Sequence, residues 1–73
     1  MAVQQSFIGS VRKLHRLFKS AIESERKAQR TYSEAMKLCR SEVIRDILQG
    51  MHDDEVAHEQ RLLEFYNELR LHD

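Results

Sequence analysis

The sequence predicts an all-α protein, an antiparallel hairpin of two long helices that pairs with a second copy to form a four-helix bundle. Three observations lead to this prediction. Proline is absent, and the residue types that favour helices are abundant. Apolar side chains recur at alternating steps of four and three along two segments, which is the spacing of a heptad seam. A short break with a capping signal separates the two segments.

The first predicted helix runs from about residue 6 to residue 39. Its seam consists of Phe7, Val11, Leu14, Phe18, Ala21, Glu25, Ala28, Tyr32, Ala35 and Cys39. This spacing is maintained for more than four heptads, and Glu25 is its one charged member. Ser6 and Ser10 are both possible N-caps, so the sequence leaves the first residue of the helix open.

The second predicted helix runs from about residue 42 to residue 70. Its seam consists of Ile44, Leu48, Met51, Glu55, His58, Leu62, Phe65 and Leu69. Ser41 is a good N-cap, and Glu42 is favourable in the first turn because it complements the helix dipole. The connection around Arg40 is therefore short, and a short connection makes the two helices antiparallel neighbours.

The chain is predicted to be a single domain, residues 1–73, that needs a partner. A chain of this size buries only about 60% of its unfolded surface, and such chains often depend on oligomers or metals. Further apolar residues lie off the two seams: Ile8, Leu17, Ile22, Met36, Ile47, Val56, Leu63 and Tyr66. With these residues, the apolar face of each helix is broad, which suits a four-helix bundle. The stripe of Val56 and Leu63 suggests a second interface and an assembly larger than a dimer.

Composition excludes several classes of function. The 12 basic and 12 acidic residues balance and are mixed along the chain, which argues against a nucleic-acid partner. The single cysteine excludes an intrachain disulfide and a four-cysteine iron site, and it fits a reduced, cytoplasmic environment. There is no long apolar run and no signal-peptide pattern, so we expect no membrane span.

Counting from the turn places three polar seam residues together. In a hairpin centred near residue 40, residues whose numbers sum to about 80 lie at the same height, as Glu25 and Glu55 do. Each is about 15 residues, or about 22 Å, from the turn. His58 follows one turn after Glu55 on the same helix face. The register therefore predicts that two carboxylates and one imidazole converge at one level.

Carboxylates in an apolar seam indicate a cation, because an uncompensated ionised group out of water costs several kcal/mol. Two hairpins related by a two-fold axis would bring together four carboxylates and two imidazoles, which two divalent cations would neutralise. Iron, manganese and zinc accept such ligands, and this oxygen-rich set suits iron or manganese better than structural zinc. Manganese, zinc or calcium could occupy the site in a crystal. The alternative is a polar layer without metal that fixes the register of a coiled coil.

The roles of the neighbouring polar residues stay open at this point. Tyr32 lies about two turns from Glu25, and it could donate a hydrogen bond to a ligand carboxylate, act as a redox neighbour, or pack in the core. The acidic side chains near the motif either attract cations at an entrance or form an ordinary solvated face; they are Glu23, Asp54 and Glu59. His15 is predicted to be a surface residue.

The pattern Glu25…Tyr32…Glu55-x-x-His58 resembles the ferritin-like superfamily. A two-helix chain with one glutamate and one Glu-x-x-His pair looks most like the encapsulated ferritins, half-ferritins that build the four-helix site between two chains. The spacings from Glu25 to Glu55 and to Tyr32 match that group. The same elements also look like rubrerythrin, whose single chain carries both halves. The resemblance covers about residues 20–68.

The resemblance implies that Glu25, Glu55 and His58 ligate iron and that the chain is a ferroxidase, with Tyr32 beside the site. Fe(II) would be oxidised by dioxygen or peroxide and passed to a mineral store for iron storage and detoxification. Such proteins form annular homodecamers inside an encapsulin shell, so the implied location is the cytoplasm, within an encapsulin nanocompartment. The alternatives are a peroxide reductase of rubrerythrin type and a non-catalytic helical dimerisation module.

Overall fold

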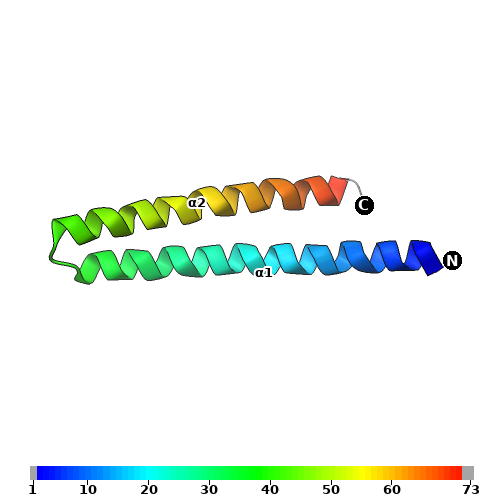
Figure 1. Ribbon diagram of the computed structural model, residues 1–73, viewed down its shortest axis with the longest axis horizontal. Helices are drawn as coiled ribbons and strands as arrows, with labels where there is room; N and C mark the ends of the chain where they lie inside the picture. The colour runs from blue at the N-terminus through cyan, green and yellow to red at the C-terminus, as the bar shows by residue number, and fades with distance from the viewer. Residues whose placement is uncertain (1, 72–73) are drawn as a thin grey trace.

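The structure, a computed structural model, describes residues 2–71 and, among their side chains, those of residues 9–71. Helix α1 spans Ala2–Leu38 and helix α2 spans Glu42–Leu71, and three residues connect them. The two helices lie side by side and run in opposite directions, and α1 extends past the end of α2 (Figure 1). The predicted antiparallel hairpin is therefore confirmed.

Helix α1 begins earlier than the sequence predicted. Both Ser6 and Ser10 lie inside the helix, so neither is its N-cap. The residues before Ser6 are mostly alanine and glutamine, which favour helix, and nothing in them stops the helix from extending. Gly9 is also helical, and no described glycine has a positive φ. At its other end, α1 stops at Leu38, one residue before the predicted end.

The turn is fixed by the predicted cap. The backbone N–H of Ile44 donates a hydrogen bond to Ser41 Oγ at 3.3 Å, and the N–H of Arg45 donates to the Ser41 carbonyl at 2.9 Å. The Arg45 guanidinium also donates to the carbonyl of Cys39, which closes the connection. Glu42 in the first turn of α2 and Lys37 in the last turn of α1 each complement a helix dipole.

Replacing the cap is expected to weaken the hairpin measurably. Ser41→Ala removes the oxygen that satisfies the N–H of Ile44, so the free energy of unfolding should fall by about 1 kcal/mol. Urea unfolding at one fixed protein concentration measures the change. Ser20→Ala, in the exposed interior of α1, is the matched control and should leave the stability within about 0.5 kcal/mol. Equal stability of the two variants would show that the cap contributes nothing.

A single hairpin leaves most of its apolar surface uncovered. Its radius of gyration is 17.2 Å, whereas a compact chain of this length has about 11 Å. Among the side chains that the structure describes, only Ile22 is buried, and it is still 5% exposed. The large apolar side chains that stay exposed are Leu14, Leu17, Leu38, Val43, Ile44, Ile47, Met51, Phe65 and Leu71. Neither α1 nor α2 has, within residues 2–71, a stretch long and apolar enough to cross a membrane.

Two aromatic contacts confirm the register that was counted from the turn. The rings of Phe18 and Phe65 lie 6.4 Å apart, and those of His15 and Tyr66 lie 5.4 Å apart. Their residue numbers sum to 83 and 81, close to the predicted 80. The prediction for His15 was wrong, because this histidine is half-buried against Tyr66 and is not a surface residue. It lies off the heptad seam, on the part of α1 that contacts α2.

Candidate metal centre

Three side chains from the two helices meet midway along the hairpin. Glu25 comes from α1, and Glu55 and His58 come from successive turns of α2. Nδ1 of His58 lies 3.6 Å from Oε2 of Glu25 and 3.8 Å from Oε1 of Glu55. One ligand atom from each of the three lies within 4.8 Å of the others. The structure thus brings together the three residues that the register singled out, which we call the triad.

The Glu25 carboxylate is the least satisfied group of the triad. Its Oε2 atom is shielded from solvent and has no hydrogen-bond partner among the described residues. A buried acceptor without a partner costs about 1–3 kcal/mol, and more when it is charged. The Glu25 and Glu55 side chains are 21% and 22% exposed, whereas that of His58 is 52% exposed. The triad is therefore closed between the helices and open on the side of His58.

The donor chemistry of the triad fits a divalent metal ion. Carboxylate oxygens and an imidazole nitrogen together suit iron, manganese and zinc. A cation between Glu25 and Glu55 would give Oε2 the partner that it lacks and would offset the repulsion between two carboxylates. The described residues of one chain bring together three ligand groups here, fewer than the four to six that these metals usually take. The open side at His58 is where further ligands could be added.

Tyr32 lies on α1 seven residues after Glu25, towards the turn. Its side chain is half-buried, and its hydroxyl makes no hydrogen bond to any described residue. Together with neighbouring side chains of α1 it lines a shallow surface groove; these are Ser24, Lys27, Ala28 and Thr31. The hairpin therefore gives Tyr32 no hydrogen bond to a ligand carboxylate, and its predicted role beside the site remains a prediction.

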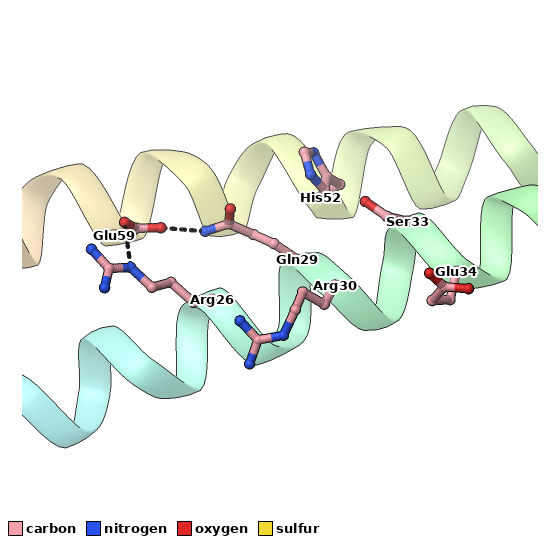
Figure 2. Close-up of a pocket in the computed structure, with 7 residues that line it drawn as sticks. All are labelled: Arg26, Gln29, Arg30, Ser33, Glu34, His52 and Glu59. Atoms are coloured by element: carbon pink, nitrogen blue, oxygen red, sulfur yellow. Dashed lines mark hydrogen bonds and ion pairs between the residues drawn. The ribbon is translucent and has the colours of Figure 1, made fainter.

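A polar groove of about 550 Å³ has a lining that includes no triad residue; Figure 2 shows its side chains, which are Arg26, Gln29, Arg30, Ser33, Glu34, His52 and Glu59. In it Glu59 of α2 accepts two hydrogen bonds from α1. Gln29 Nε2 donates to Glu59 Oε1 at 2.7 Å, and Arg26 Nε donates to Glu59 Oε2 at 2.9 Å. The hydrogen bond from Gln29, followed by that from Arg26, holds the pKa of Glu59 below its ordinary value. The hydrogen bond that Arg26 donates to Glu59, and then the negative charge of Glu59, raise the pKa of Arg26.

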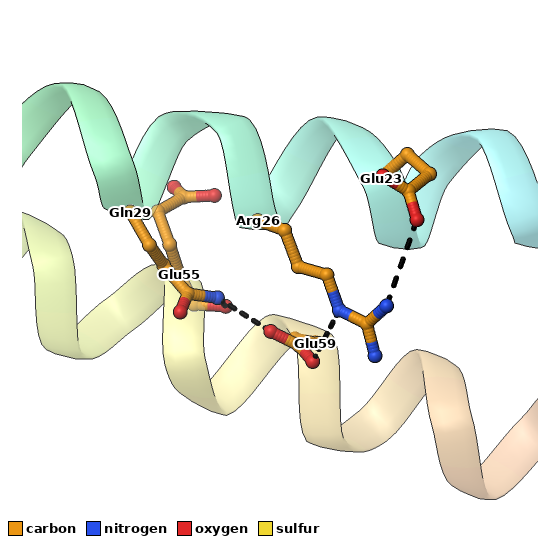
Figure 3. Close-up of polar contacts among 5 residues, drawn as sticks. All are labelled: Glu23, Arg26, Gln29, Glu55 and Glu59. Carbon is orange, nitrogen blue, oxygen red and sulfur yellow. Dashed lines mark hydrogen bonds and ion pairs between the residues drawn. The ribbon is translucent and has the colours of Figure 1, made fainter.

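The alternative that Glu59 belongs to an ordinary solvated face was wrong, whereas its predicted role at a cation entrance stays a prediction. Glu59 is not a solvated side chain, because it is only 18% exposed, and both its oxygens are occupied by Arg26 and Gln29 (Figure 3). Glu23 also pairs with Arg26, at 3.5 Å, and its side chain is 69% exposed. Asp54 is exposed, as an ordinary solvated face requires. These acidic groups do not join the triad.

Arg26 and Gln29 were not predicted from the sequence, although one signal points to the first. The numbers of Arg26 and Glu59 sum to 85, so the register count places opposite charges about 7.5 Å apart in height, which two long side chains can span. Whether they face each other depends on the rotation of each helix about its axis, which heptad spacing does not give.

His52 lies in the polar groove and not in the triad. Its Nδ1 is 3.3 Å from the carboxylate of Asp53, which also accepts a hydrogen bond from Gln49 at 2.9 Å. The hydrogen bond from Gln49, and after it that from His52, lowers the pKa of Asp53. Asp53 thus makes two local contacts within α2, with Gln49 and with His52, and neither contact involves a triad residue.

Comparisons with known proteins identify one family. A family model described as a ferritin-like domain matches residues 3–72, nearly the whole chain. A search of curated proteins gave no match to the chain. A search of solved structures gave none either.

Proposed function

The chain belongs to the ferritin-like domain family, and from this premise we propose that two copies of it form a di-iron ferroxidase. One observation carries the proposal. Oε2 of Glu25 is buried without a hydrogen-bond partner among the described residues, in a group whose three ligand atoms lie within 4.8 Å of one another. A negative oxygen in that position is best explained by a cation, and proteins of this family generally bind iron. Iron is here the substrate of the reaction.

The ligand count supports a site shared by two chains. Ferritin-like di-metal sites take one glutamate from each of two helices and a Glu-x-x-His pair from each of two more. One hairpin supplies half of this set, Glu25 from α1 and Glu55 with His58 from α2. A two-fold axis on the open side of the triad would supply the other half. Four carboxylates and two neutral imidazoles carry a charge that two divalent cations balance.

The exposed apolar side chains support the same pairing. Ile44 lies 11 residues from Glu55 towards the turn, and Leu14 lies 11 residues from Glu25 away from it, about 16 Å in each case. A two-fold axis through the triad would therefore bring Ile44 of one chain to the height of Leu14 of the other. Both side chains are exposed in the hairpin, at 52% and 40%. Met51 and Phe65 lie on the same seam and are exposed as well.

The proposed chemistry is a two-electron oxidation of iron. Each of two Fe(II) ions gives up one electron, and one dioxygen molecule takes both electrons with two protons to form hydrogen peroxide. With peroxide as the oxidant, two electrons and two protons give two water molecules. The chain's own contribution is to hold two cations next to each other with carboxylates that can bind one ion or bridge both.

An Fe(II) oxidation assay tests the proposal. Apo protein mixed with Fe(II) and dissolved dioxygen should form Fe(III) several-fold faster than buffer with the same iron, at two ions per pair of chains. Absorbance of Fe(III) and an oxygen electrode measure the rate and the ratio of two Fe(II) per dioxygen. Faster turnover with peroxide and an added reductase would favour the rubrerythrin-like alternative. A chain that binds no metal would be a dimerisation module, and the proposal would be wrong.

We further propose the encapsulated type of ferritin, an annular homodecamer held in the cytoplasm inside an encapsulin shell. The support is the sequence resemblance of Glu25, Tyr32, Glu55 and His58 to that group. A ring needs a second interface, and the hairpin offers a groove of about 340 Å³ on the side of Ile22, away from the triad. The native mass of the iron-loaded protein tests this extension, because a stable dimer would exclude a ring.

A further inference from the structure

The contact between α1 and α2 has two sides at the level of the triad. Successive helical residues are rotated by about 100°, so Arg26 points away from the direction of Glu25, and Glu59 points away from that of His58. On one side lie the triad residues, where a carboxylate oxygen of Glu25 and one of Glu55 lie within 4.8 Å of each other. On the other side Arg26 and Gln29 of α1 both donate to the carboxylate of Glu59 of α2 (Figures 2 and 3).

We call Arg26, Gln29 and Glu59 the Glu59 latch. Each of them is adjacent in the sequence to a triad residue or lies one helical turn from one. Arg26 directly follows Glu25, and Gln29 lies one turn after it. Glu59 directly follows His58. Nε2 of Gln29 also lies 3.5 Å from the backbone carbonyl of Glu55. The Gln29 amide therefore contacts both the Glu59 carboxylate and the backbone of a triad residue.

A contact of this kind is needed before a cation arrives. The carboxylates of Glu25 and Glu55 repel each other, and a small roll of either helix about its axis would separate them. A metal site requires its ligands to be held within about 0.5 Å of the productive geometry. The latch opposes such a roll because its hydrogen bonds are charge-assisted and Glu59 is only 18% exposed.

We propose that Arg26, Gln29 and Glu59 are positioning residues, which hold the two helices so that the triad is assembled in the absence of metal. The inference rests on the proposed function, since it assigns the latch a role at that same site. A latch with a structural role alone would add stability to the hairpin and leave the affinity of the triad for a cation unchanged.

Titration of the apo protein with Co²⁺ tests this role, because cobalt reports its ligand geometry in its visible spectrum. Glu59→Ala is expected to weaken Co²⁺ binding by about 10- to 100-fold and to alter the spectrum. Glu59→Gln removes the charge and keeps one acceptor oxygen, which can accept from Arg26 or from Gln29 but not from both in the wild-type geometry, and it should bind Co²⁺ more tightly than Glu59→Ala does. Glu64→Ala removes an exposed carboxylate of α2 and should match the wild type.

The outcomes separate the latch from the proposed function. Wild-type affinity and spectrum in Glu59→Ala would overturn the latch alone. Equal losses in Glu59→Gln and Glu59→Ala would overturn it too, because the charge and not the positioning would then matter. Wild-type protein that binds no Co²⁺ would overturn the proposed function and the latch with it. Circular dichroism checks that each variant is helical, and Gln29→Ala repeats the test if Glu59→Ala does not fold.

Discussion

Replacing Glu25 by alanine is expected to abolish Fe(II) oxidation while leaving the apo protein as stable as the wild type, or more stable. Glu25 is the one ligand that α1 contributes, and its loss takes two of four carboxylates from the paired site. The remaining ligands cannot hold two adjacent cations. The rate of Fe(III) formation should therefore fall to that of buffer with the same iron.

The stability of Glu25→Ala separates a metal ligand from a structural residue. Wild-type apo protein carries the cost of Oε2, a buried acceptor with no hydrogen-bond partner among the described residues, and the alanine variant does not. The free energy of unfolding should therefore stay equal or rise by about 1–2 kcal/mol in metal-free buffer. With Fe(II) or Zn²⁺ present, the order should reverse, because only the wild type gains from binding.

Glu34→Ala is the matched control for this experiment. Glu34 also lies on α1, but its side chain is 70% exposed, and Lys37 is its ion-pair partner among the described residues. Such a surface ion pair contributes at most about 1 kcal/mol, and its removal should leave iron oxidation unchanged. Oxidation at the wild-type rate in Glu25→Ala would show that Glu25 is not a ligand.

Assembly is expected to depend on metal and on the apolar seam together. A cation bound by two chains stabilises the paired state, by about 2.7 kcal/mol at a free concentration 100 times the dissociation constant. Adding Fe(II) under anaerobic conditions, or Zn²⁺, should raise the native mass of dilute apo protein at least twofold. A chelator should reverse the change. Light scattering or sedimentation measures the mass.

Phe65→Lys should prevent this assembly even with metal present. The Phe65 side chain is 59% exposed in the hairpin and lies on the seam that carries the triad. A two-fold interface would bury it twice, so its loss should cost about 3 kcal/mol or more, which is at least a hundredfold in the dimer dissociation constant.

Leu71→Lys is the control for the assembly experiment. Leu71 is an equally apolar residue of α2, 79% exposed, but it lies off the heptad seam near the open end of the hairpin. Its replacement should leave the metal-dependent mass unchanged. If both variants assemble like the wild type, the seam is not the interface and the proposed shared site is wrong.

Much of the fold could be predicted because its determinants are local. The absence of proline and the heptad spacing predict two helices, and Ser41 predicts where the second begins. A short turn fixes the height of every residue along its helix, so counting placed Glu25 level with Glu55. Phe18 and Phe65 confirm this count. Helix α1 was predicted too short because two possible caps, Ser6 and Ser10, lie within a stretch that favours helix.

Rotation about each helix axis was not available from the sequence. His58 and Glu59 are adjacent in the chain, yet one joins the triad and the other lies in the polar groove with Arg26. Heptad spacing describes a broad face, and it does not say which edge of that face meets the other helix. That choice is made by the packing of side chains such as Ile22, the one buried residue among those described.

The sequence by itself therefore determined the helices, the turn and the height at which two carboxylates and an imidazole meet, because these follow from residue spacing and covalent connection. Only the tertiary structure decided which neighbours face each other across the helix contact. It placed the half-buried His15 against Tyr66 and joined Glu59 to Arg26. The physical reason is that the height along a helix is fixed by 1.5 Å per residue, whereas the line of contact is set by the competition of many side chains for the same space.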